Sequence, residues 1–174
     1  MTQTTTTKKT TRTRRKPVET KQVEKTAKLP PNPFMNEILD LVCRQDTREA
    51  KINILKEYEN DAIKALFIWN YDDTVTSVLP EGAVPYKANQ NPLGTDHSSL
   101  RREYKYLYNF VKGGNDGLST IRRETMFIQI LEGLHPNEAE ILCLVKDKRL
   151  QERYKIPFDI VEEAYSDIKW GDRS

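Results

Sequence analysis

Cysteine is scarce in this chain of 174 residues, which contains only Cys43 and Cys143. No CxxC pair or Cys/His cluster surrounds either of them, so the sequence offers no zinc site. Each lies among apolar residues of a predicted helix, which indicates a reduced thiol packed as a small hydrophobic side chain in a cytosolic protein.

With two histidines and no GxSxG, P-loop or HExxH motif, the sequence predicts no catalytic residue, no cofactor and no enzyme activity.

Long apolar runs are also missing. No stretch of about 18 apolar residues occurs, so we expect no transmembrane helix and no membrane partner. The first residues are polar and basic and lack the apolar core segment of a secretory signal. The sequence leaves the oligomeric state open.

Acidic residues are rare in residues 1–32. This segment contains nine Lys and Arg but only two acidic residues, Glu19 and Glu24, so its net charge is +7. The whole chain carries +2, so residues 33–174 carry −5. Ten threonines and almost no large apolar side chains complete this segment, which cannot bury enough surface to fold and is predicted to be disordered. We therefore expect a disordered tail over 1–32, ended by the stiff run LPPNP (29–33), and a single helical domain over 33–174.

The domain has the periodicity of helices. Asn32 is predicted to cap a first helix with Pro33 at its first position, and Asp46 with Glu49 forms the outline of a capping box for a second. Asn60 or Asp61 is expected to cap a third helix, from Ala62 to about Tyr71. That helix is apolar on more than one side, which predicts burial or an interface.

Residues 72–98 have no helical period. The β-branched residues 74–79 predict a short extended piece, and 80–98 predicts one long loop, of the kind that is often functional. Ser98 or Asp96 is expected to cap a fourth helix whose apolar stripe is Leu100, Tyr104, Leu107 and Val111, stopped by the glycines at 113 and 114.

The most apolar stretch, 118–150, predicts a helical hairpin. Its first helix spans Leu118 to Glu132 with Leu118, Ile121, Ile128 and Leu131 on one side, and its second starts at Pro136. A last short helix is expected after Pro157, with Trp170 folded back as an apolar anchor. Together these patterns predict an all-α fold, a compact bundle of six to seven short helices.

The basic tail is the clearest binding signal. Lysine and arginine on an unstructured segment bind phosphate backbones by releasing counterions. An acidic protein partner, or a role in solubility alone, are the alternatives. The candidate nucleic-acid-binding residues are Lys8, Lys9, Arg12, Arg14, Arg15 and Lys16.

A secondary candidate surface combines basic residues with interleaved Tyr104, Tyr106 and Tyr108, a combination that can stack single-stranded nucleic acid, although ordinary helix surface has the same composition. Its basic residues are Arg101, Arg102, Lys105, Arg122 and Arg123.

Two further patterns are weaker. The hairpin resembles a helix-turn-helix, but glutamates at 138 and 140 would face the phosphates, so simple helix packing is favoured. Asp72, Asp73, Asp96 and His97 match no metal-ligand spacing, so turn and cap roles are favoured over a metal site.

The strings SVLPEGAVPY (77–86), YNFVKGG (108–114), RRE (122–124), LEGLHP (131–136) and LVKDK (144–148) resemble a family of uncharacterised small proteins of T-even-like tailed phages, notably cyanophages and other marine phages. The resemblance covers about 35–173. It implies a viral protein that acts in the cytoplasm of a bacterial host or in the virion, and it transfers no activity and no catalytic residue.

Two functions follow as expectations. The first is a non-enzymatic phage accessory protein, a helical adaptor that docks on a phage or host protein while its basic tail contacts nucleic acid or a nucleic-acid-bound complex. The second is a virion structural or assembly component whose tail contacts neighbouring subunits or packaged DNA.

Overall fold

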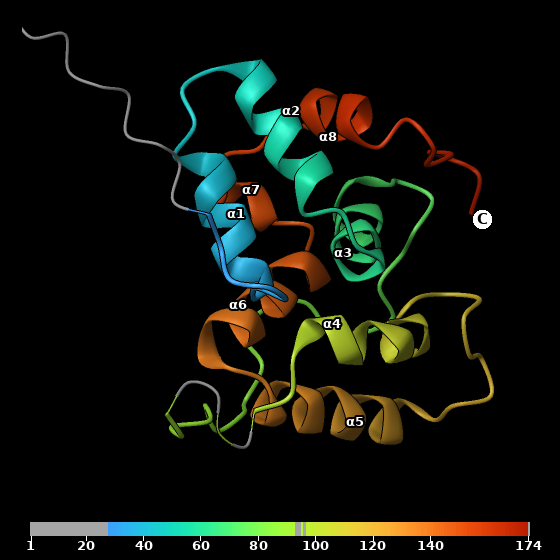
Figure 1. Cartoon of the computed structure of the whole chain (residues 1–174). Helices are drawn as coiled ribbons and strands as arrows, with labels where there is room; N and C mark the ends of the chain where they lie inside the picture. Colours follow the sequence, from blue (N-terminus) through green and yellow to red (C-terminus); the bar gives the residue numbers. More distant parts are fainter. Residues whose placement is uncertain (1–27, 93–94, 96, 174) are drawn as a thin grey trace, which may run out of the picture.

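A computed structural model describes residues 28–173 of the chain, except for 93, 94 and 96. The predicted all-α bundle is confirmed in this part of the chain, which holds eight α-helices, one 3-10 helix and two isolated β-bridges (Figure 1). Residues 1–27 of the predicted disordered tail (1–32) lie outside the described residues. The elements are α1 (Met35–Cys43), α2 (Arg48–Glu57), α3 (Asp61–Tyr71), α4 (Leu100–Glu103), η1 (Tyr104–Phe110), α5 (Thr120–Gly133), α6 (Pro136–Lys146), α7 (Leu150–Arg153) and α8 (Phe158–Ala164).

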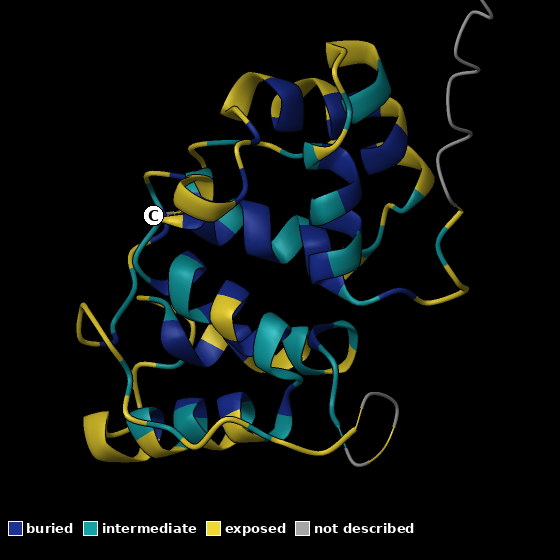
Figure 2. Cartoon of the chain, turned by 90° about the vertical axis from the view of Figure 1, so that its left-hand side faces the viewer, coloured by how far each residue is buried: buried dark blue, intermediate teal, exposed yellow. Residues whose placement is uncertain are grey.

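The helix α3 lies at the centre of the bundle, where it contacts α4, η1 and α6. The pair α2 and α8 packs together at one end, and α5 lies along the opposite end against η1 and α6 (Figure 1). Buried residues face inward from each of these helices (Figure 2). A helix that is surrounded by other elements must be apolar all round, which explains the composition of α3.

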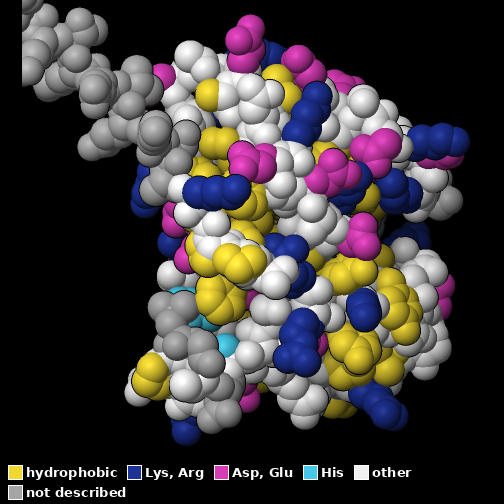
Figure 3. All heavy atoms as spheres, viewed as in Figure 1, with side chains coloured by type: hydrophobic (Ala, Val, Ile, Leu, Met, Phe, Trp, Pro, Cys, Tyr) yellow, Lys and Arg dark blue, Asp and Glu magenta, His cyan; other side chains and the backbone are white. Residues whose placement is uncertain are grey.

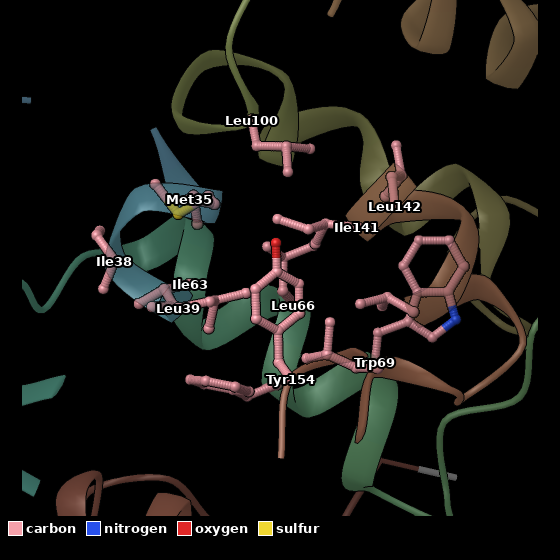
Figure 4. Close-up of a cluster of buried hydrophobic side chains, with 14 of the residues drawn as sticks. Met35, Ile38, Leu39, Ile63, Leu66, Trp69, Leu100, Ile141, Leu142 and Tyr154 are labelled. Carbon is pink, nitrogen blue, oxygen red and sulfur yellow. The ribbon is translucent and has the colours of Figure 1, made fainter. Parts of the chain in front are cut away.

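Side chains from distant parts of the sequence meet in one core. Figure 4 shows residues of α1, α3 and α6 converging with Leu100 and Tyr154. Phe67 and Trp69 are both buried, so the apolar sides of α3 form core and not a docking surface. Trp69 stacks on Phe110 of η1 with 6.4 Å between the ring centroids, which joins the central helix to the 3-10 segment.

Several predicted helix starts are confirmed. The side chain of Asn60 caps α3 by accepting a hydrogen bond from the N–H of Ile63 at 3.0 Å. The helix α6 begins at Pro136 with His135 as its cap residue, and α8 begins directly after Pro157. Trp170 folds back onto Phe158 of α8, with ring centroids 5.0 Å apart, as predicted.

The first two predicted caps are wrong. Asn32 has a positive φ of 60° and does not cap α1, whose cap residue is Phe34. The N–H of Phe34 donates to the Glu37 carboxylate at 2.8 Å, so a residue inside the helix provides the closure. For α2 the cap is Thr47, not Asp46, since its hydroxyl accepts from the N–H of Ala50.

The predicted fourth and fifth helices also differ from the structure. Only four residues after Ser99 are α-helical, and a 3-10 helix replaces the rest, so Phe110 is buried where Val111 was expected. In α5 the predicted inward residue Ile121 is 81 % exposed, whereas Arg123 is buried. The reason is polar: hydrogen bonds from Arg123 to backbone carbonyls, described below, fix the rotation of α5.

The stretch 74–98 runs across the bundle and is attached at several points. The predicted extended piece is confirmed near Ser77, which forms an antiparallel bridge with Val111. Farther along, the N–H of Lys87 donates to the Glu132 carboxylate at 3.0 Å, and the N–H of Ser98 donates to the Gly133 carbonyl at 2.7 Å. The loop is therefore tied to α5 on both sides of the residues that the structure leaves undescribed.

Glu138 is a fully buried carboxylate near the start of α6. One of its oxygens accepts from the N–H of Met35, and the other accepts from the N–H of Leu100, each at 2.8 Å. Both donors are the first N–H groups of their helices, which have no partner inside the helix. Burial raises the pKa of Glu138, and the two backbone hydrogen bonds oppose that rise. A single side chain thus closes α1 and α4 from α6.

Asp72 is a second buried carboxylate, at the end of α3. It accepts from the N–H and hydroxyl of Thr74, the N–H of Gly171 and the guanidinium of Arg173. Burial alone would raise its pKa, but these hydrogen bonds together lower it below the ordinary value. The turn role predicted for Asp72 is confirmed, and the residue also attaches the C-terminal segment to α3.

We expect Asp72→Asn to lower the free energy of unfolding by about 1–3 kcal/mol at pH 7, because charge-assisted hydrogen bonds are lost. The lowered pKa means that the carboxylate stabilises the fold above the unfolded-state pKa of about 4, and that this contribution is lost as the pH falls through the folded-state pKa. Urea unfolding at pH 7 and at pH 3 measures the difference, which should shrink at pH 3. An equal difference at both pH values would contradict this role.

Candidate nucleic-acid interface

The six basic residues predicted to bind nucleic acid through the tail, at positions 8, 9, 12, 14, 15 and 16, lie outside the described residues. The structure does show where the tail is attached to the body. The N–H of Leu29 donates to the hydroxyl of Tyr58 at 3.1 Å, and the guanidinium of Arg101 donates to the carbonyl of Pro33 at 3.1 Å. Leu29 also packs against the core. The packed chain therefore begins earlier than the predicted boundary at 33, in a position between α2 and α4.

The residues of the secondary candidate surface have different surroundings. Arg102, Lys105 and Arg122 are exposed, on α4, η1 and α5 respectively. Arg101 is half-buried, faces the junction at Pro33, and lies close enough to Glu138 to lower the pKa of that carboxyl. These positions leave three of the predicted basic residues fully available to a ligand and one partly engaged.

Arg123, the fifth of these residues, is a structural residue. Its Nε donates to the carbonyl of Asn109 and one terminal nitrogen donates to the carbonyl of Asn115, each at 2.8 Å. The side chain of Asn115 in turn donates to that of Asn109 at 2.8 Å. Because the buried guanidinium donates to these two backbone carbonyls, Arg123 does not belong to an exposed binding surface as predicted. It holds the end of η1 against α5.

The 3-10 geometry of η1 sorts its side chains by a period of three, because residues i and i+3 lie one above the other. Leu107 and Phe110 share one edge and are buried. Lys105 and Tyr108 share a second edge, and both are exposed. Tyr106 lies on the third edge and is 51 % exposed, while Tyr108 is 52 % exposed. The helix therefore presents two tyrosine rings and an ammonium group to solvent from a core-anchored backbone.

Tyr106 borders a groove between η1 and α5 with a volume of about 300 Å³. Met126 and Ile130 provide its apolar wall, and the amide of Gln129 and the carboxylate of Glu103 supply polar groups. The Ser98 hydroxyl donates to that carboxylate, which fixes its position. The groove combines a flat aromatic side, an apolar side and a few hydrogen-bonding groups, which is the general character of a ligand site.

The segment that contains η1 and α5 is opposite in net charge to the rest of the body. Residues 100–133 contain six Lys and Arg against four Asp and Glu, whereas 33–174 as a whole carries −5. In the space-filling view, Lys and Arg side chains are interspersed with hydrophobic ones over α4 and η1 (Figure 3). We call this region, formed by α4, η1 and the facing side of α5, the aromatic-basic surface.

The two histidines lie together at another edge of the bundle. The rings of His97 and His135 meet edge to face with centroids 5.4 Å apart, and His135 stacks on Phe34 at 5.7 Å. The Nδ1 of His135 accepts from the N–H of Asn137 and so caps α6. Burial and the neighbouring His97 lower the pKa of His135. This arrangement makes His135 the cap residue of α6.

No group of three or more His, Cys, Asp or Glu side chains suited to a metal ion occurs in the part of the chain that the structure describes. Asp72 is engaged in the C-terminal contacts given above, and Asp96 lies outside the described residues.

Cys43 and Cys143 are free and half-buried. None of the described helices is both long and apolar enough to cross a membrane.

The fold and the aromatic-basic surface define a small all-α protein with a core-anchored 3-10 helix and a basic N-terminal extension. The chain belongs to DUF6433, a family of unknown function, which it matches over residues 38–152. That match includes η1 and α5 but neither the basic tail nor α8. No curated protein and no solved structure shows significant similarity to the chain.

Proposed function

We propose that this protein is a non-enzymatic accessory protein of a tailed phage, acting in the cytoplasm of the bacterial host. In this proposal the helical body is an adaptor that docks on a phage or host protein, and the basic tail contacts nucleic acid or a nucleic-acid-bound complex. The observation that carries it is the separation of charge, with +7 over residues 1–32 and −5 over residues 33–174.

Charge of this kind acts through the phosphate backbone. Each lysine or arginine that neutralises a phosphate releases a condensed counterion, so a cluster of six cations binds without a preformed surface. The hydrogen bond from Leu29 to Tyr58 fixes the point at which the basic segment joins the helical body, near the end of α2. The resemblance to small proteins of T-even-like phages supports the viral setting.

Replacing the six tail residues by glutamine in the full-length chain should weaken DNA binding and flatten its salt dependence. If all six contact phosphates, the slope of log K against log salt for duplex DNA falls in magnitude by about 5, at roughly 0.9 per phosphate. Fluorescence anisotropy across a salt titration measures both quantities. The substitutions are made at Lys8, Lys9, Arg12, Arg14, Arg15 and Lys16.

The matched control exchanges lysine for arginine and arginine for lysine at the same six positions, which preserves the charge. It should retain the affinity and the slope. An unchanged slope in the glutamine variant would refute the proposed tail contact. Affinity purification from infected cells, with and without nuclease, then tells whether nucleic acid bridges the protein to its partner.

A further inference from the structure

We infer that the aromatic-basic surface is a second, separate binding site, which accepts unpaired bases of a single-stranded nucleic acid. Tyr106 and Tyr108 stack on the bases, and Arg102 and Lys105 hold the neighbouring phosphates. The inference deepens the proposed function and rests on its contact with nucleic acid, but it concerns the folded body and names the form of nucleic acid recognised.

The exposure of Tyr106 and Tyr108 is the first observation that supports base stacking at this surface. Each leaves about half of its surface in water, at 51 % and 52 %, whereas Tyr154 and Tyr165 are buried in the core. Neither Tyr106 nor Tyr108 donates its hydroxyl to another residue in the described part of the chain. Every base has an aromatic face, so exposed tyrosine rings bind unpaired bases with little regard to sequence.

The groove beside Tyr106 carries the second step. Its volume of about 300 Å³ is at the lower end of the range for small-molecule sites, which begins near 300 Å³. Met126 and Ile130 line the same groove, so a base lying on the Tyr106 ring would be near their side chains. The amide of Gln129 and the carboxylate of Glu103 line the same groove, where they can pair with the polar edge of a base.

Charge decides between nucleic acid and an apolar protein segment as the occupant. Residues 100–133 have an excess of Lys and Arg in a body that is otherwise acidic, and Arg102 and Lys105 of this segment are exposed. Lys105 and Tyr108 share an edge of η1, which sets an ammonium group beside an aromatic ring. Exposed rings beside cations match a strand of bases and phosphates, whereas a duplex hides the faces of its bases.

The surface is also rigid, which reduces the entropy lost when a ligand binds. The Arg123 guanidinium donates a hydrogen bond to the Asn109 carbonyl, and the N–H of Val78 donates to the carbonyl of Phe110 at 2.9 Å. The stack of Phe110 with Trp69 anchors η1 in the core. The tyrosine rings thus project from a backbone that is fixed on two sides.

The test compares a single-stranded oligonucleotide of about 20 nucleotides, longer than typical stacking footprints, with a duplex of the same sequence. We expect Tyr106→Ala in the full-length chain to weaken single-strand binding by about 5- to 150-fold, the range found for loss of one stacking side chain. Tyr108→Ala should act in the same direction. Duplex affinity, which depends on the tail, should be unchanged in both variants.

Tyr106→Phe keeps the ring and should keep the single-strand affinity. Lys105→Ala should weaken single-strand binding, whereas Lys56→Ala, which removes an exposed lysine of α2 far from this surface, should have no effect. If both tyrosine variants bind single strands as tightly as the parent chain, or lose single-strand and duplex affinity equally, the inference is wrong.

The two proposals fail in different ways. If the tail variant loses its salt dependence while the tyrosine variants are unaffected, the proposed function stands and the second site does not exist. If the parent chain binds neither form of nucleic acid, both proposals fall.

Discussion

Replacing Glu138 by alanine is expected to lower the free energy of unfolding by about 3–5 kcal/mol, the cost of leaving buried polar partners uncompensated. The substitution removes the acceptor of the first N–H of α1 and that of α4, which lie 2.8 Å from the two carboxylate oxygens. Both N–H groups are buried and would have no water to bind. Since domains are stable by only about 5–15 kcal/mol, the variant should be close to unfolding at 37 °C.

Glu138→Gln removes the charge of this side chain and keeps its shape. The amide keeps one acceptor oxygen but turns an NH₂ group toward the second backbone donor, so one hydrogen bond is replaced by a repulsive contact. We expect a loss of about 1–3 kcal/mol, smaller than for alanine. Chemical unfolding followed by far-ultraviolet circular dichroism measures both variants.

The neighbouring Glu140 supplies the control, because it lies on the same helix but is exposed and pairs with Arg153 at the surface. Glu140→Ala should change the stability by no more than about 1 kcal/mol. Equal effects at 138 and 140 would mean that the buried carboxylate does not close the two helices.

Gly114→Ala is expected to destabilise the protein by about 3 kcal/mol, at the upper end of the usual cost of overpacking. The added methyl carbon would lie 1.9 Å from the carbonyl oxygen of Tyr108 and 2.8 Å from its carbonyl carbon. These are backbone atoms, so the end of η1 would have to shift. The same shift would displace Tyr108, so single-strand binding should weaken together with the stability.

Gly117 gives a matched control three residues later. A methyl group there would come no closer than 3.9 Å to the Asn115 side chain, an ordinary contact. Gly117→Ala should be neutral, or stabilising by up to about 1 kcal/mol through the loss of unfolded-chain entropy. Midpoints of urea unfolding for the two alanine variants test the difference, and similar midpoints would show that the turn at 114 tolerates a side chain.

The parts of the fold that the sequence predicts are those set by local signals. Asn60, Pro136 and Pro157 begin helices because capping and proline geometry act within a few residues. The apolar composition of α3 predicts burial or an interface, and the structure shows burial. The charge of the basic tail is also a local feature, because it can be counted from the sequence. Its disorder and its contact with nucleic acid stay predictions.

The missed features depend on partners that are distant in sequence. Glu138 looks like a surface residue in any periodic pattern, yet its donors lie 103 and 38 residues away. Arg123 is buried because carbonyls of the preceding segment need donors. The 3-10 period of η1 is a third case. Its aromatic and Asn residues are weak α-helix formers, which was a usable signal for a break in the predicted fourth helix.

The bond between Leu29 and Tyr58 sets a limit on reach. The 27 residues that precede Lys28 can extend no more than about 90–100 Å from this point, whatever shape they take, since each residue spans at most about 3.6 Å. On a duplex that rises about 3.4 Å per base pair, this is a span of about 25 to 30 base pairs. A ligand bound by the first residues would therefore lie within that distance of the helical body.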